Sequence, residues 1–160
     1  MELIIPELGL VRDIDAKTES YFCEKNQHLI LTEEHVQQLK NHLVKTNNYS
    51  VRINLHRSSD DIFHQMIIIH RKGGLFRPHK HLYKEESHHI IEGKLRINIY
   101  NSDGTIKDST VLCLLEPGLP MIFRLRENTW HETIPESEFA IFHESKPGPF
   151  LSNDSIFPNW

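Results

Sequence analysis

Cysteine is scarce in this sequence, and its scarcity excludes a fold built on disulfides. The two cysteines, Cys23 and Cys113, lie far apart among 160 residues and form no C-x-x-C pair. A small secreted domain stapled by disulfides needs several closely spaced cysteines, so we expect both thiols to be free. Cys113 stands in V-L-C-L-L, where a buried thiol behaves as a small hydrophobic side chain.

Long apolar runs and a surplus of positive charge are also missing. No run approaches the ~20 apolar residues that cross a bilayer. The N-terminal M-E-L-I-I-P-E-L has acidic residues where a signal peptide has basic ones. The chain has 22 acidic and 18 basic residues, a net charge of -4, and no basic stripe. We therefore expect a cytoplasmic protein that has no nucleic-acid partner and no membrane partner.

One helix can be predicted together with its boundaries. Thr32 is a suitable N-cap, and two glutamates follow it where carboxylates favour the helix dipole. Apolar residues from Val36 to Leu43 repeat at helical spacing. These signals predict an amphipathic helix over about residues 33–45, with His42 in solvent.

From Val51 onward the hydrophobic pattern has the period of two that is typical of strands. Residues 51–57 and 95–100 alternate, whereas residues 63–71 are apolar on both faces and predict a buried strand. The turn sequence N-S-D-G predicts a hairpin. Further strands are expected at residues 110–115, 121–126 and 139–145. Strands of this number, joined by tight turns, predict a mainly β protein with a small antiparallel sandwich or barrel.

The length suits one domain, in which we distinguish three parts. Residues 1–48 are predicted to form an N-terminal arm and the helix, which pack on the barrel. Within the arm, residues 3–5 suggest a short strand, and the rest shows no clear pattern. Residues 49–150 are predicted to form the barrel, and residues 151–160 a C-terminal tail that wraps its outside.

Residues 73–93 hold the most informative motif, G-G-L-F-R-P-H-K-H-L-Y-K-E-E-S-H-H-I-I-E-G. His79 and His81 are two apart, so on an extended strand both imidazoles face the same side and can reach one ion. Glu86 follows five residues after His81, and His131 arrives far downstream in T-W-H-E-T. Imidazole nitrogens with a carboxylate oxygen suit a divalent transition metal such as Zn, Fe, Ni, Mn or Cu.

This spacing of glycines, histidines and a glutamate resembles the first metal-binding motif of cupins. The resemblance implies a cupin double-stranded β-helix, a jelly-roll barrel, preceded here by the predicted helix. Of the second cupin motif, only His131 is matched literally. Asn128 stands where a glycine is usual, and asparagine is tolerable there because it enters the left-handed backbone region more readily than most residues.

Side chains beside the motif leave alternatives open. Glu85 rivals Glu86 as the metal ligand, although Glu86 fits the motif spacing better. His88 has the strand parity of Glu86, so it either faces the cavity as an acid/base or packs as a hydrogen-bonded structural residue. Arg77 shares the parity of the ligand histidines and could hold an anionic substrate, whereas a surface salt bridge is the more common fate of an arginine.

Beyond the general pattern, the chain resembles the WbuC family of cupin-fold metalloproteins over about residues 29–160. The matching pieces are N-L-H at 54–56, R-P-H-K-H and K-E-E-S within 77–87, E-G at 92–93, the turn N-S-D-G, T-W-H at 129–131 and E-S-K-P-G-P-F at 144–150. The resemblance implies one divalent metal, Zn, Fe, Ni or Mn, held by His79, His81, Glu86 and His131. It also implies a bacterial protein linked to sugar or nucleotide-sugar chemistry, since members resemble proteins encoded among lipopolysaccharide O-antigen genes.

Three functions are compatible with these residues. The first is a metal-dependent isomerase or epimerase of a small polar metabolite, in which the metal acts as a Lewis acid and His88 carries a proton. The second is an Fe(II)-dependent dioxygenase, and the third is a non-catalytic metal-bearing binding module. For the first we expect an anionic sugar as ligand, held by Arg77. A homodimer is expected because many cupins dimerise through edge strands or an N-terminal arm.

Overall fold

The computed structural model describes residues 3, 5–23, 28–151 and 153–160. The strand expected at residues 3–5 includes Ile4, which lies outside the described residues, and its neighbours Leu3 and Ile5 belong to no strand. The elements in chain order are β1 (Leu10–Arg12), β2 (Glu19–Cys23), α1 (Glu33–Thr46), β3 (Ser50–Asn54), β4 (Phe63–Arg71), β5 (Lys80–His81), β6 (Glu86–Tyr100), β7 (Ile106–Cys113), β8 (Ile122–Leu125), β9 (Trp130–Pro147) and β10 (Ser155–Ile156).

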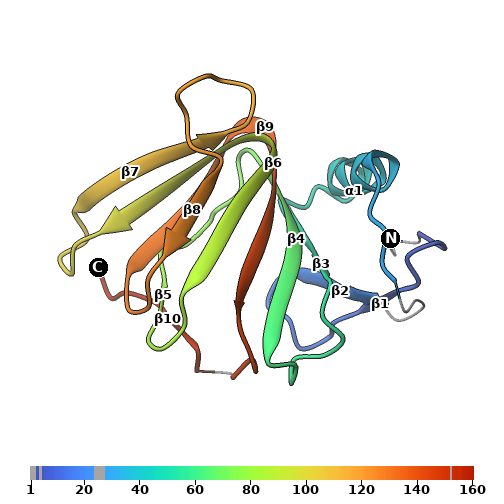
Figure 1. Cartoon of the computed structure of the whole chain (residues 1–160), viewed down its shortest axis with the longest axis horizontal. Helices are drawn as coiled ribbons and strands as arrows, with labels where there is room; N and C mark the ends of the chain where they lie inside the picture. The colour runs from blue at the N-terminus through green and yellow to red at the C-terminus, as the bar shows by residue number, and fades with distance from the viewer. Residues whose placement is uncertain (1–2, 4, 24–27, 152) are drawn as a thin grey trace.

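The strands form a jelly-roll sandwich with the single described helix at one side (Figure 1). The main sheet has the order β1-β2-β3-β4-β9-β6-β7, with β8 paired to β6, while β5 and β10 make a separate two-stranded sheet. The prediction of a mainly β chain with a helix before the barrel is confirmed. The described residues contain no helix long and apolar enough to span a membrane.

The two longest strands, β6 and β9, run through the centre of the fold and pair with each other in antiparallel register. The first residues of β6 also pair with β8, and its later residues pair with β7. Irregularities in the β6–β9 register at Ile90–Glu92 and Gly93–Leu95 mark where β6 changes from one neighbour to the other. Such bulges bend a strand and let it serve two parts of a sandwich.

The strand β4 separates two apolar clusters. Ile67 and Ile69 face one cluster, which includes Leu39 and Leu43 of the helix. Met66 and Ile68 face the other cluster, inside the barrel. Burial on both faces follows from the unbroken apolar run of this strand, as predicted. The buried Cys113 and the free state of both cysteines also agree with prediction.

The helix begins and ends close to the predicted residues. Thr32 caps it: the Thr32 side chain accepts a hydrogen bond from the His35 backbone N–H. The placement of His42 in solvent was wrong. His42 is buried, and its Nε2 lies 2.7 Å from Oε1 of Glu19 on β2. The reason is that β2 pairs in parallel with β3 and brings a buried carboxylate against the helix, a long-range contact that helical periodicity does not encode.

Gly93 is the position where the β6 bend depends most on glycine. Its φ is 77°, and an added Cβ would overlap the Phe139 carbonyl oxygen and Ser137 Oγ of β9. Gly118 has a similar φ of 88° but open space around the position of a Cβ. A residue with a Cβ would therefore suffer the same kind of backbone strain at either position, and at Gly93 it would also meet a neighbouring strand.

We predict that Gly93→Ala destabilises the protein much more than Gly118→Ala. Backbone strain alone should cost about 1–2 kcal/mol at Gly118, whereas at Gly93 the strands β6 and β9 must also separate. Chemical denaturation of both variants would measure the free energy of unfolding. Equal losses of unfolding free energy in the two variants would show that the pairing of β6 with β9 does not require the absence of a side chain at residue 93.

Candidate metal centre

The predicted ligand residues come from three segments that meet at one end of the barrel. His81 lies in β5, Glu86 begins β6, and His131 is the second residue of β9. His79 is joined to His131 by a pair of backbone hydrogen bonds, each 2.9 Å long. This bridge places the ring nitrogens of His79, His81 and His131 within 4.8 Å of one another. Folding thus brings residues 50 positions apart into one site.

Glu86 lies against the histidines. Its Oε1 is 2.9 Å from His81 Nε2, and its Oε2 is 3.2 Å from His131 Nε2. The side chain of Glu86 is only 2% exposed. Two ligand atoms at right angles on a metal with bonds of ~2.1 Å lie ~3.0 Å apart. The observed spacings are therefore those of neighbouring positions around one ion.

The second ring nitrogen of each histidine is hydrogen-bonded to a backbone carbonyl. Nδ1 of His79 lies 3.1 Å from the Arg77 oxygen, Nδ1 of His81 lies 3.1 Å from the Asp154 oxygen, and Nδ1 of His131 lies 3.0 Å from the Thr129 oxygen. A carbonyl can only accept, so each Nδ1 carries a proton. In a neutral imidazole this leaves Nε2 with its lone pair as a ligand atom.

This tautomer creates a demand for a cation. A neutral His81 Nε2 and a Glu86 carboxylate oxygen are both acceptors, and they face each other in a buried place. His81 Nε2 has no hydrogen-bond partner among the described residues. Either a proton or a metal ion must therefore lie between the two acceptors. The donor set and its geometry fit a divalent transition metal.

The ionisation of these groups follows from their surroundings. Burial opposes the charge on Glu86, but the ammonium of Lys146 and the contacts from His131 and His81 outweigh it, so the pKa of Glu86 lies well below its usual value. Burial lowers the pKa of His79 to about 4, so this imidazole is neutral at physiological pH. Both groups are thus in the form that a metal requires.

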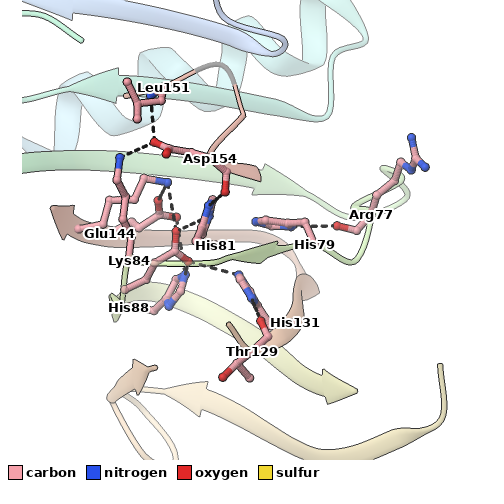
Figure 2. A network of polar contacts seen from close by, with 12 residues as sticks. Arg77, His79, His81, Lys84, His88, Thr129, His131, Glu144, Leu151 and Asp154 are labelled. Carbon is pink, nitrogen blue, oxygen red and sulfur yellow. Dashed lines mark hydrogen bonds and ion pairs between the residues drawn. The ribbon is translucent and has the colours of Figure 1, made fainter. Parts of the chain in front are cut away.

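A second polar cluster adjoins the first in the barrel interior (Figure 2). It contains Glu86 and His88 of β6 with Glu144 and Lys146 of β9. The Lys146 ammonium lies 3.1 Å from Glu86 Oε1 and 3.1 Å from Glu144 Oε1. Its pKa is raised, because the two carboxylates outweigh the effect of burial. Lys146 and Glu144 were not predicted as site residues, although they continue the inward parity of the buried Phe142.

His88, predicted as an acid/base or a packed residue, lies between the two glutamates. Its Nε2 is 3.6 Å from Glu144 Oε2 and 3.8 Å from Glu86 Oε2, and its ring is 1% exposed. Burial lowers the pKa of His88, but the carboxylate of Glu144 and then that of Glu86 raise it further, so the net shift is upward. Its position is compatible with proton transfer, and the role itself stays a prediction.

Two other candidates lie away from the cluster. Glu85, the rival ligand, forms an exposed ion pair with Arg124. The Arg77 guanidinium lies 5.0 Å from the centre of the Phe157 ring, and Figure 2 shows the side chain pointing away from the histidines. Only the backbone oxygen of Arg77 contacts a predicted ligand, so its role in substrate binding stays a prediction that the side-chain direction does not favour.

The C-terminal tail takes part in the site. Its strand β10 pairs with β5, with Ser155 opposite His81. The Asp154 backbone oxygen accepts a hydrogen bond from His81 Nδ1, and the Asp154 carboxylate forms an ion pair with Lys84. The tail therefore orients one ligand histidine, which its sequence did not indicate.

Comparisons with known proteins identify a family and a fold. The family described as "Domain of unknown function (DUF6016)" matches residues 31–112. A search of curated proteins found no significant match.

Among solved structures, protein SO0799 from Shewanella oneidensis is similar to this chain, with a TM-score of 0.55 and 16% sequence identity, over 66% of this chain and 72% of that one. CapF, solved with the inhibitor 3-isopropenyl-tropolone, has a TM-score of 0.53 and 14% identity, over 70% of this chain and 33% of CapF. These neighbours are cupin-fold proteins, so the cupin fold is confirmed, while membership of the WbuC family is not.

We predict that metal content depends on Glu86 and not on Glu85. His81→Ala and Glu86→Ala should each lower the bound metal sharply, because each removes an atom of the converging set. Glu85→Ala is the matched control, since it removes the adjacent carboxylate, and His143→Ala is a control for loss of a histidine elsewhere. Elemental analysis of the purified variants measures the outcome. Metal retained in Glu86→Ala but lost in Glu85→Ala would reverse the ligand assignment.

Metal binding should weaken as the pH falls. A proton and the metal compete for each Nε2, and a free imidazole titrates near ~6.5. Metal content should thus be constant above that pH and fall below it. Equilibrium dialysis over a pH series, followed by elemental analysis, would show the release. Since the pKa of His79 is about 4, retention of the metal well below that pH would contradict a site based on three imidazoles.

Proposed function

The chain belongs to the family described as a domain of unknown function, DUF6016, and from its buried site we propose that it is a metal-dependent cupin enzyme of small polar metabolites. The observation that carries this proposal is that His79, His81 and His131 each offer a ligand atom within 4.8 Å of the others, with Glu86 carboxylate oxygens 2.9 Å from His81 Nε2 and 3.2 Å from His131 Nε2. Imidazole nitrogens and a carboxylate oxygen suit a divalent metal. Four protein ligands on a six-coordinate ion would leave two positions for a substrate.

When bound, the metal supplies a Lewis acid that polarises an oxygen of the substrate. The residues of the chain supply the rest of the chemistry. His79, His81, Glu86 and His131 hold the ion, and His88 holds a proton on the inner face of the barrel. Since His88 Nε2 lies between two carboxylates that favour its protonated form, it is suited to donate a proton.

We further propose that the substrate is a sugar or a sugar derivative connected with O-antigen synthesis. This part rests on the resemblance to the WbuC family that the motifs around residues 77–87, 129–131 and 144–150 carry. It is an inference from family context, and fold alone does not specify a substrate.

A ligand screen on protein of known metal content would test the proposal. We expect the purified protein to contain about one divalent metal per chain, held by His79, His81 and His131 with Glu86. We also expect sugar derivatives to raise its melting temperature, and the metal-depleted protein to lose that response. Oxygen consumption by the Fe(II)-loaded protein with the same ligands would instead favour an oxygenase. Tight binding with no conversion of any ligand would favour a non-catalytic module, and absence of stoichiometric metal would overturn the proposal.

A further inference from the structure

Lys146 is a buried cation that the proposed chemistry does not yet use. Its side chain is 13% exposed, and it lies on β9 next to the candidate metal centre. A lysine ammonium has three N–H donors. One of them is donated to Glu86 Oε1, while Glu144 Oε1 lies 3.1 Å from the ammonium as an ion-pair partner without a hydrogen bond. At least one donor is therefore left for a ligand.

The charge of the cluster also calls for a ligand. The carboxylates of Glu86 and Glu144 and the ammonium of Lys146 together carry one net negative charge, and a proton on His88, which lies between the two glutamates, makes the cluster neutral. A divalent cation would change the net charge to one positive charge with His88 neutral and to two with His88 protonated. A buried charge without a counterion is costly, so the metal-bearing site favours an anionic ligand.

A cavity borders this cluster on the side of Glu86 and Lys146. Its volume is about 280 Å³, and both Glu86 and Lys146 line it, together with Phe63, Arg124 and Ser145. The Arg124 guanidinium also has free donors, but its side chain is 56% exposed and pairs with Glu85, whereas the Lys146 side chain is 13% exposed. The volume lies at the lower limit of ligand pockets, which span roughly 300–1,000 Å³. It suits a compact metabolite better than a nucleotide sugar.

We propose that Lys146, and not Arg77, is the anion-binding residue of this protein, and that the ligand is a small carboxylate such as a sugar acid. The ligand lies in the cavity beside Glu86, and its carboxylate accepts the remaining Lys146 N–H. A carboxylate is a smaller anionic group than a phosphate monoester, and this suits a cavity of about 280 Å³. This inference rests on the proposed metal-binding function and narrows its substrate class.

Matched ligands and matched variants test this assignment by calorimetric titration. Glucuronate, glucose and glucose 6-phosphate differ at one group of the sugar, and acetate and glycolate probe the carboxylate alone. Lys146→Met by itself leaves two carboxylates without a buried counterion and risks misfolding. The double variant Lys146→Met/Glu144→Gln removes the ammonium and keeps the net charge of the cluster. Arg77→Met removes the competing cation. Elemental analysis is done on every protein.

We expect wild-type protein to bind carboxylates and not glucose. The double variant should bind them about ten- to a hundredfold more weakly, as expected for loss of one charge-assisted hydrogen bond. Its metal content should be retained, and Arg77→Met should bind as wild type does. Undiminished binding in the double variant, or weakened binding in Arg77→Met alone, would overturn the role of Lys146. Tighter binding of glucose 6-phosphate than of glucuronate would overturn the carboxylate class. If wild-type protein retains metal but binds no carboxylate, this inference fails while metal binding stands; if it holds no metal, the proposed function fails first.

Discussion

The organisation of this site depends on one electrostatic constraint: several buried acceptors face each other, and they need a shared cation. Backbone carbonyls accept hydrogen bonds from Nδ1 of all three histidines, so Nε2 of His81 and of His131 present lone pairs to Glu86. Lys146 neutralises part of the negative charge through Glu86 Oε1, the oxygen that also faces His81, while Glu86 Oε2 faces His131. A proton can satisfy one such pair at low pH, whereas a metal ion can satisfy all of them at once.

The fold provides this arrangement through strand pairing and not through local sequence. The antiparallel register of β6 and β9 places His88 opposite Glu144 and brings Lys146 to Glu86. The bridge between His79 and His131 attaches the short β5 segment to β9, and β10 holds it from the other side. Each ligand is therefore oriented by the pairing of its own strand, so the imidazoles have little freedom to turn away from the ion.

The sequence was most informative where local patterns and chemistry coincide. The helix cap, the alternating strands and the spacing from His79 to Glu86 are all short-range signals. Asn128, expected to tolerate the left-handed region, has a φ of 57°. The features that the sequence did not predict depend on long-range strand pairing, or on a local pattern that is usually found at the surface. Glu144 and Lys146 share the inward parity of Phe142, but a charged pair near the end of a strand is more often exposed, and only the register with β6 shows that Glu144 is buried and that the Lys146 side chain is just 13% exposed. The parallel pairing of β2 with β3 has no local signature at all, which is why the burial of His42 could not be foreseen.

The cluster behind Glu86 gives the metal ligand a property that a four-residue set alone would not have. Lys146 contacts the oxygen of Glu86 that also faces His81, so the ammonium and a metal ion would draw on the same carboxylate. A carboxylate oxygen that also accepts a hydrogen bond from the lysine would give less electron density to a metal. The bound ion would then be a stronger Lewis acid. Glu144 limits this effect because it holds the same ammonium from the other side. With a metal bound as proposed, the balance between the two glutamates would set both the charge at the ion and the strength of the hydrogen bond that Lys146 could donate to a ligand.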